Sequence, residues 1–162
     1  MKYIIIIIST IFLIISCVKT KSPAVFKDTD FTLEKIDGGT ITLSQLKKKV
    51  ILIDFWATWC PPCQEAIPHL VDLYDKYKDK GLAILGISLD QNKEAIPPFI
   101  NEYKINYPIL LGNQEVAKKY QIQGIPTFFV FDRSGNIVYK EVGFSEKSKS
   151  QLEIKIKELL EQ

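Results

Sequence analysis

The sequence is poor in residues that bind metal ions. Its 162 residues include three cysteines and a single histidine, His69. A structural zinc site needs four ligands of the cysteine, histidine or carboxylate type, and no second pair of closely spaced cysteines is present to complete one. The composition therefore counts against a resident metal, and we expect no metal site.

A strong charge of either sign is also missing. The chain has 21 lysines and arginines and 19 aspartates and glutamates, which gives a formal net charge of +2. The one basic run, Lys47–Lys49, precedes a predicted strand and favours a solvated turn over a nucleic-acid surface. Hydrophobic residues at 46% and charged residues at 25% are ordinary for a globular domain. We therefore expect neither disorder, nor a polytopic membrane protein, nor a nucleic-acid partner.

No hydrophobic run is long enough to form a transmembrane helix. The apolar stretch 4–15 is twelve residues long and is broken by Ser9 and Thr10, whereas a spanning helix needs about 20 residues. Its length suits an export signal, and the small residues before Cys17 resemble the lipobox of bacterial lipoproteins. In this interpretation residues 1–17 are a signal peptide and Cys17 becomes a lipidated first residue. An uncleaved or ordinarily cleaved signal with an unmodified cysteine is the alternative.

The rest of the chain is predicted to be a tether and one domain. Residues 18–27 contain lysine, serine and proline and suit a tether. Residues 28–162 are enough for one domain with a hydrophobic core and too few for two. We thus expect an extracytoplasmic domain anchored by lipid to a bacterial membrane.

Two cysteines separated by two prolines follow an apolar run. Residues 50–57 are nearly all apolar, as in a strand buried on both faces, and Cys60 and Cys63 come directly after them. If a helix begins at Cys60, its free N–H groups and its dipole favour a thiolate there. This arrangement predicts a dithiol redox site in which Cys60 attacks and Cys63 resolves. A structural disulfide stays possible, although so short a loop gains little stability from it, and so does use of the pair as metal ligands.

Alternating patterns predict an α/β fold with a mixed sheet. Asp37-Gly38-Gly39 indicates a hairpin turn between strands at 31–36 and 40–43. Strands at 50–57 and 82–89 are expected to be parallel and joined by a helix, kinked at Pro68. The other predicted elements are a helix ending near 104, a strand at 107–111, a helix at 114–120, a hairpin of strands at 127–131 and 136–142, and a helix at 145–160.

These residues carry a resemblance to a known family. The glycine hairpin, the segment 50–63, Pro68 and the segment 124–128 resemble the exported, membrane-tethered TlpA/ResA-like thiol-disulfide oxidoreductases of the thioredoxin superfamily, which have an AhpC/TSA-like redoxin domain. The likeness covers roughly residues 26–160. It implies a thioredoxin fold, with a central mixed β-sheet flanked by helices and an N-terminal β-hairpin. It also implies an inserted segment between the second core strand and the cis-proline region.

The resemblance gives roles to two residues of the segment 124–128. Pro126 matches the family's cis-proline, and Ile125 before it would offer backbone groups to an extended substrate segment. Without the resemblance, a proline at this place indicates only an ordinary turn. Trp59, beside Cys60, is expected to be an exposed contact for partners.

An acidic residue interrupts the apolar run at Asp54. A buried carboxylate must be paired, protonated or functional, because burial without a partner raises its pKa and costs stability. Asp54 matches the aspartate of cytosolic thioredoxins that relays protons to the second cysteine. Many TlpA/ResA-like proteins instead carry a glutamate where this chain has Ala66, and Glu65 precedes that position. We expect Asp54 to be the proton relay, with Glu65 or a merely structural Asp54 as the alternatives. His69 would lie on another helix face than Cys63 and is not expected to be its base.

The predicted function is membrane-tethered reduction of disulfides in exported proteins, without a cofactor. By the same resemblance, apocytochrome c is a candidate substrate, and a membrane transporter of the DsbD or CcdA type is the candidate electron donor.

Two other classes of function stay open. A thiol peroxidase would share the N-terminal hairpin, but such enzymes carry a threonine where Ala57 stands, three residues before the first cysteine. A non-catalytic metal-binding or chaperone role would use the thiols as ligands or not at all.

Overall fold

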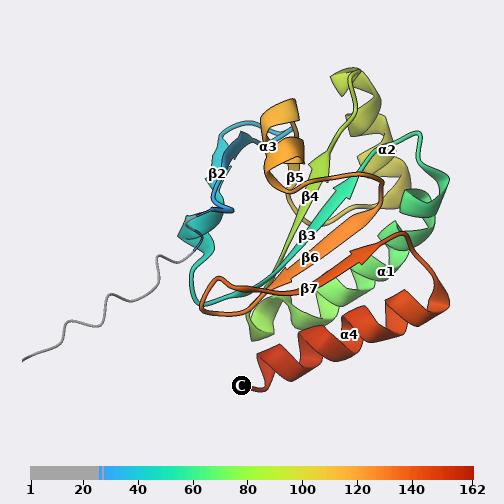
Figure 1. The fold of residues 1–162 in the computed structure, drawn as a ribbon. Coiled ribbons are helices and arrows are strands. Elements are labelled where there is room, and N and C mark those ends of the chain that lie inside the picture. Colours follow the sequence, from blue (N-terminus) through green and yellow to red (C-terminus); the bar gives the residue numbers. More distant parts are fainter. Residues whose placement is uncertain (1–25, 27) are drawn as a thin grey trace, which may run out of the picture.

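Two apolar runs form the centre of the main sheet. Strands β3 (Val50–Trp56) and β4 (Leu82–Ser88) are buried along their whole length and pair in parallel, as expected for strands that are covered on both faces. The computed structural model describes Phe26 and residues 28–162. It has a five-stranded sheet in the order β5-β4-β3-β6-β7 (Figure 1). The other three strands are β5 (Ile109–Leu111), β6 (Thr127–Phe131) and β7 (Ile137–Val142).

The sheet is mixed, as predicted. Strand β5 pairs in parallel with β4, whereas β6 runs antiparallel to both β3 and β7. The glycine hairpin forms a separate two-stranded sheet of β1 (Thr32–Glu34) and β2 (Thr40–Thr42), in which Gly38 and Gly39 have the positive φ angles that the turn requires.

Helices cover both faces of the sheet. The helices are α1 (Pro61–Tyr77), α2 (Ile96–Tyr103), α3 (Gln114–Lys119) and α4 (Glu146–Leu160), with short 3-10 turns at Leu43–Leu46, Lys78–Lys80 and Lys93–Ala95. Buried side chains of α1, α2 and α4 pack on one face, and those of α3 and β1 pack on the other (Figure 1). The expected thioredoxin-like architecture is confirmed, and the predicted insertion contains the turn at Lys93–Ala95 and α2.

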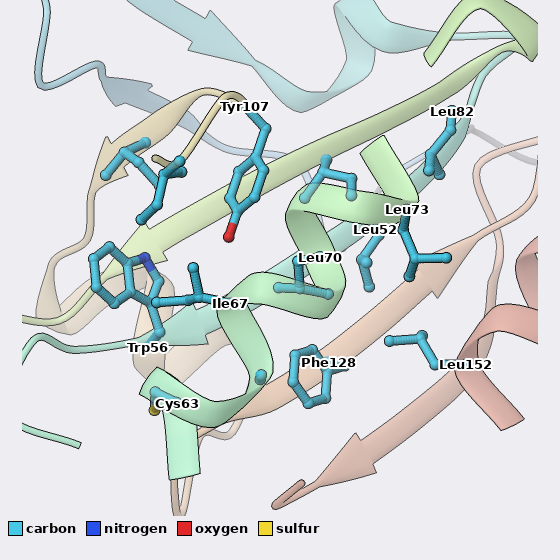
Figure 2. Close-up of a cluster of buried hydrophobic side chains, with 14 of the residues drawn as sticks. Leu52, Trp56, Cys63, Ile67, Leu70, Leu73, Leu82, Tyr107, Phe128 and Leu152 are labelled. Atoms are coloured by element: carbon cyan, nitrogen blue, oxygen red, sulfur yellow. The ribbon is translucent and has the colours of Figure 1, made fainter. Parts of the chain in front are cut away.

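Alternation along β3 divides its side chains between two cores. Leu52 and Trp56 lie in the core against α1, and Ile53 and Phe55 lie in the opposite core. Asp54 has the parity of the first pair, so its carboxyl points to the face that α1 covers. Figure 2 shows this first core, with Leu52 of β3 behind α1 and Trp56 beside the first turns of the helix.

Phe26 is the first described residue and packs with the folded domain. This side chain is buried and its ring centroid lies 5.6 Å from that of Phe131, although the sequence placed residue 26 in the tether. The predicted signal peptide with Cys17 and the rest of the predicted tether lie outside the described residues. Within the part of the chain that the structure describes, no helix has the length and hydrophobicity needed to cross a membrane.

Candidate active site

The two cysteines lie where β3 gives way to α1. They form a disulfide with their Cα atoms 5.2 Å apart. Cys60 is the N-cap of α1, and its sulfur accepts the backbone N–H of Cys63 at 3.3 Å. Pro61 and Pro62 fill the first helical positions, where no N–H donor is needed. After reduction the same N–H and the helix dipole would face the Cys60 sulfur, which favours its thiolate.

The cysteines and the neighbouring tryptophan differ in exposure. Cys63 is 0% exposed and Cys60 4%, whereas Trp59 is 67% exposed. Trp59 and Thr58 also border a surface hollow of about 410 Å³ whose other lining residues are Leu89, Asp90, Gln91, Asn92 and Ala95. The site therefore presents a large aromatic surface beside a nearly enclosed sulfur.

The loop before β6 lies against the disulfide. The Ile125–Pro126 peptide bond is cis, and the carbonyl oxygen of Ile125 is 3.6 Å from the Cys60 sulfur. The N–H of Gly143 donates to the Pro126 carbonyl at 2.8 Å, and the Thr127 hydroxyl donates to the Gly124 carbonyl at 2.6 Å. The backbone bond from Gly143 and the side-chain bond from Thr127 thus hold this loop next to Cys60. The cis bond expected at Pro126 is present, and the substrate contact of Ile125 stays a prediction.

Asp54 is an isolated carboxyl in the core against α1. The residue is 0% exposed, and neither carboxyl oxygen has a hydrogen-bond partner among the described residues. Burial raises the pKa of Asp54 from 3.8 to about 8. Its neighbours across the sheet are Gly86 on β4 and Phe128 on β6. Cys63 belongs to the same core, so a titratable group close to neutral pH lies on the face of the sheet that holds the second cysteine.

Two further side chains with polar atoms, Tyr107 and Trp56, share this core. Tyr107 and Trp56 are both buried, and the indole N–H of Trp56 also lacks a partner among the described residues. Burial, followed by the charge of Asp54, raises the pKa of Tyr107 well above its usual value. A Cβ atom at Gly86 would lie 3.0 Å from the Trp56 indole nitrogen, so this glycine is what lets the indole lie close to β4. Figure 2 shows the Tyr107 hydroxyl pointing toward α1 on the Trp56 side of the core.

Glu65 and His69, the other two residues of α1 that the sequence analysis discussed, lie apart from this arrangement. Glu65 is exposed at the surface of the helix. His69 is buried near Phe144, with ring centroids 6.2 Å apart, and its Nε2 has no partner among the described residues. Burial, and then the positive charge of Lys149, lower the pKa of His69. His69 is thus a neutral part of the contact between α1 and the segment that leads into α4.

Sequence reasoning also missed Asp90, which hydrogen-bonds the loop before Cys60. One signal in the sequence could have indicated it: Ser88 and Asp90 stand at the carboxyl end of an apolar strand, where functional residues of α/β folds gather. Among the described residues, no group of three or more histidine, cysteine, aspartate or glutamate side chains is arranged to hold a metal ion.

Similarity to known proteins agrees with this geometry. The AhpC/TSA family model matches residues 27–140. Thiol-disulfide oxidoreductase ResA of Bacillus anthracis is 34% identical over 131 residues, which cover 80% of this chain and 75% of that protein. ResA of Bacillus subtilis strain 168 is 32% identical over 120 residues, 74% of this chain and 67% of that one.

Solved structures show the same likeness. A thiol:disulfide interchange protein of the thioredoxin family from Chlorobium tepidum superposes with a TM-score of 0.74 at 29% identity, over 82% of this chain and 94% of that one. StoA from Bacillus subtilis gives a TM-score of 0.66 at 29% identity, over 77% and 94% of the two chains. With its Cys60–Cys63 pair, this chain belongs to the AhpC/TSA family and, within it, to the ResA-like thiol-disulfide oxidoreductases.

Proposed function

We propose that this protein is a lipid-anchored reductase that acts outside the cytoplasm on disulfides of exported proteins. The observation that carries the proposal is the Cys60–Cys63 pair at the start of α1, with the Ile125 carbonyl 3.6 Å from the Cys60 sulfur and Trp59 exposed beside it. Backbone groups at Ile125 can pair with an extended substrate segment, and Trp59 can cover it.

The reaction is an exchange between the Cys60/Cys63 dithiol and a substrate disulfide. The Cys60 thiolate attacks one sulfur of the substrate disulfide, and the other substrate sulfur leaves as a thiolate that takes up a proton. Cys63 then loses its proton and attacks the Cys60 sulfur, which releases the second substrate thiolate. Two electrons pass to the substrate, and the protein is left with the Cys60–Cys63 disulfide that the structure contains.

Asp54 is the proposed acceptor of the Cys63 proton. Its pKa of about 8 and its place in the core that holds Cys63 support this role. A base must have a pKa near the working pH to accept a proton and pass it on. The carboxyl of Asp54 meets this requirement because burial raises its pKa to about 8.

The reduced enzyme must be regenerated by a dithiol donor. We propose that this donor is a membrane transporter of the DsbD or CcdA type. The domain can contact it because lipidated Cys17 holds the domain at the membrane. Exported proteins with cysteines are the proposed substrates, and apocytochrome c is the first to test. Equilibration with a glutathione redox buffer would give the reduction potential of the Cys60/Cys63 pair. This potential decides the direction of electron transfer, since a site more reducing than its substrates donates electrons.

Trapping of mixed disulfides tests the cysteine roles. Cys63→Ser leaves the attacking thiol without its resolving partner, so covalent complexes with substrates should accumulate in the cell. Cys60→Ser is the matched control and should trap none. Complexes that form with Cys60→Ser and not with Cys63→Ser would reverse the two roles.

The anchor is tested separately. Cys17→Ala removes the sulfur to which lipid would be attached, so the protein should move from the membrane to the soluble fraction. Equal membrane partitioning of both proteins, with the N-terminal segment still attached, would instead show an uncleaved anchor.

A further inference from the structure

The peptide of Thr58, two residues before Cys60, is held on both sides. Its N–H donates to the two carboxylate oxygens of Asp90 at 3.0 and 3.2 Å, and its hydroxyl donates to the same carboxylate at 2.7 Å. Its carbonyl accepts the side-chain amide of Gln64 at 2.8 Å. One carboxylate and one amide thus fix the orientation of this peptide.

Asp90 is itself tied to the sheet. Its second carboxylate oxygen accepts the hydroxyl of Ser88 at 2.8 Å, and its N–H donates to that hydroxyl oxygen at 3.1 Å. Ser88 is 1% exposed, ends β4, and pairs with Trp56, the last residue of β3. The carboxylate therefore links the buried end of β4 to a loop that is separated from it by 32 positions in the sequence.

The loop that Asp90 holds carries the reactive sulfur. It runs from Ala57 to Cys60, and the described backbone bonds within it include the Cys60 N–H to the Ala57 carbonyl at 3.2 Å. Trp59, in the same loop, is 67% exposed and has little packing to hold it. The direction in which α1 begins, and with it the N–H that faces the Cys60 sulfur, depends on where the Thr58 peptide lies.

We propose that Asp90 is a positioning residue for Cys60. Its carboxylate fixes the Thr58 peptide, and the fixed peptide sets the Cys60 sulfur against the first N–H groups of α1. The proposal rests on the proposed role of Cys60 as the attacking thiol. It assigns to the end of β4 a part in the reaction that the cysteine motif by itself does not contain.

A pair of Asp90 variants separates geometry from charge. Asp90→Asn and Asp90→Ala both remove the negative charge, but only asparagine keeps an oxygen that can accept the Thr58 N–H and hydroxyl. The rate of Cys60 alkylation by iodoacetamide is measured in reduced protein from about pH 4 to pH 9, and its midpoint reports thiolate formation. Each variant carries Cys63→Ser, so that one thiol of the site is read.

Near neutral pH, Cys60 is expected to be alkylated about fivefold more slowly in Asp90→Ala than in Asp90→Asn, because misplacement of a reacting group is costly. The midpoint of its pH profile is expected to be about one pH unit higher. Cys60 is likewise expected to be alkylated about twofold more slowly in Thr58→Val, which loses the hydroxyl bond to Asp90, than in Thr58→Ser. Equal profiles for Asp90→Ala and Asp90→Asn would overturn the proposal.

Asp132 supplies a matched control. Its carboxylate also accepts three hydrogen bonds, from the N–H groups of Ser134 and Asn136 and from the Asn136 amide. It lies in the β6–β7 turn, at the end of the sheet where Phe131 pairs with Ile51 and opposite to the Cys60 end (Figure 1). Asp132→Ala should lower the melting temperature and leave the alkylation profile of Cys60 in place. A loss of Cys60 reactivity equal to that of Asp90→Ala would show a general effect of destabilisation and would overturn the proposal.

Failure of the proposed function can be distinguished from failure of the Asp90 proposal. If Cys60→Ser still reduced protein disulfides, the role of Cys60 would be wrong, and the Asp90 proposal would fall with it. If Cys60→Ser is inactive and the two Asp90 variants are alike, only the role of Asp90 is wrong.

Discussion

The chemistry of Asp54 depends strongly on its surroundings. A carboxyl group with a pKa of 3.8 in water has a pKa of about 8 here, because burial disfavours its charged form and none of the described residues donates a hydrogen bond to it. The unfolded chain binds no proton at this position at neutral pH, whereas the folded chain does. Two consequences follow, one for stability and one for the reaction.

Stability should depend on pH through this residue. Because the pKa of Asp54 is raised in the folded state, its protonation contributes to the free energy of unfolding. This contribution is fully present below about pH 3.8 and is lost as the pH rises toward 8. By pH 7 the loss amounts to about 4 kcal/mol. Asp54→Asn lacks this titration. The free energy of unfolding of Asp54→Asn minus that of the wild type should therefore increase steadily between pH 4 and pH 8. Urea unfolding of the oxidised proteins measures it, and a difference independent of pH would refute the buried, unpaired state.

The reaction should depend on the same titration. The rate at which Cys63 resolves the mixed disulfide should rise with pH in the wild type, as Asp54 ionises near its pKa of about 8. In Asp54→Asn this rise should be missing and resolution should be several-fold slower near neutral pH, with the difference shrinking where the thiol ionises unaided. Stopped-flow measurements on a mixed disulfide follow the step directly.

Glu65→Gln is the control for this experiment. Glu65 is exposed on the same helix, and its substitution should not alter the pH profile. If Glu65→Gln abolished the rise and Asp54→Asn did not, the proton relay would be Glu65.

At the scale of the element, α1 and α4 begin in different ways. At α1 a cysteine is the cap and two prolines follow, so the cap position is used for reactivity. At α4 the cap is a reciprocal pair: the Ser145 hydroxyl accepts the N–H of Ser148 at 3.2 Å, and the Ser148 hydroxyl accepts the N–H of Ser145 at 2.7 Å. The second arrangement satisfies two backbone donors and serves stability alone.

Ser145→Ala tests this difference. The substitution removes one half of the cap and should lower the free energy of unfolding by about 1 kcal/mol. Ser150→Ala, at an exposed position inside α4, is the control and should cost nothing, because alanine is the better helix former. Urea denaturation gives both values. Cys60 alkylation should be the same in both variants, and a change in it would mean that the start of α4 reaches the active site.

At the scale of the whole molecule, two cores on either face of one sheet hold the active site rigid. The core against α1 includes Cys63, and the opposite core extends to Phe26, near the N-terminal limit of the described residues. Ion pairs between described residues, such as Lys76 and Glu153, lie at the surface and add little to stability. Stability therefore comes from burial, and the segment around Phe26 contributes to it.

Phe26→Ala should measure that contribution. The side chain is 4% exposed and packs against Phe131, so its removal should lower the free energy of unfolding by about 3 kcal/mol. Ile154→Ala, at a position that is 57% exposed on α4, should change it by less than about 0.5 kcal/mol. Equal effects of the two substitutions would mean that residue 26 belongs to the tether, as the sequence alone suggested.

The sequence by itself determined the order of the elements and the place of the cysteines. The continuous apolar runs at 50–57 and 82–89 and the prolines after Cys60 are local signals, because period and capping depend on neighbours in the chain. For the same reason the sequence could place a helix between these two strands with a proline inside it, and the structure has α1 over Pro61–Tyr77 with Pro68 within it.

Only the tertiary structure decided what surrounds these residues. Asp90 holds Thr58 across 32 positions in the sequence, burial and then the charge of Asp54 raise the pKa of Tyr107, and Phe26 packs against Phe131. No local pattern contains such contacts, since they depend on strand order and on the close packing of side chains from distant segments. The pKa of Asp54 is decided in the same way: the sequence shows an acid in an apolar strand, and the packing of α1 over that strand removes the water that would have kept it charged.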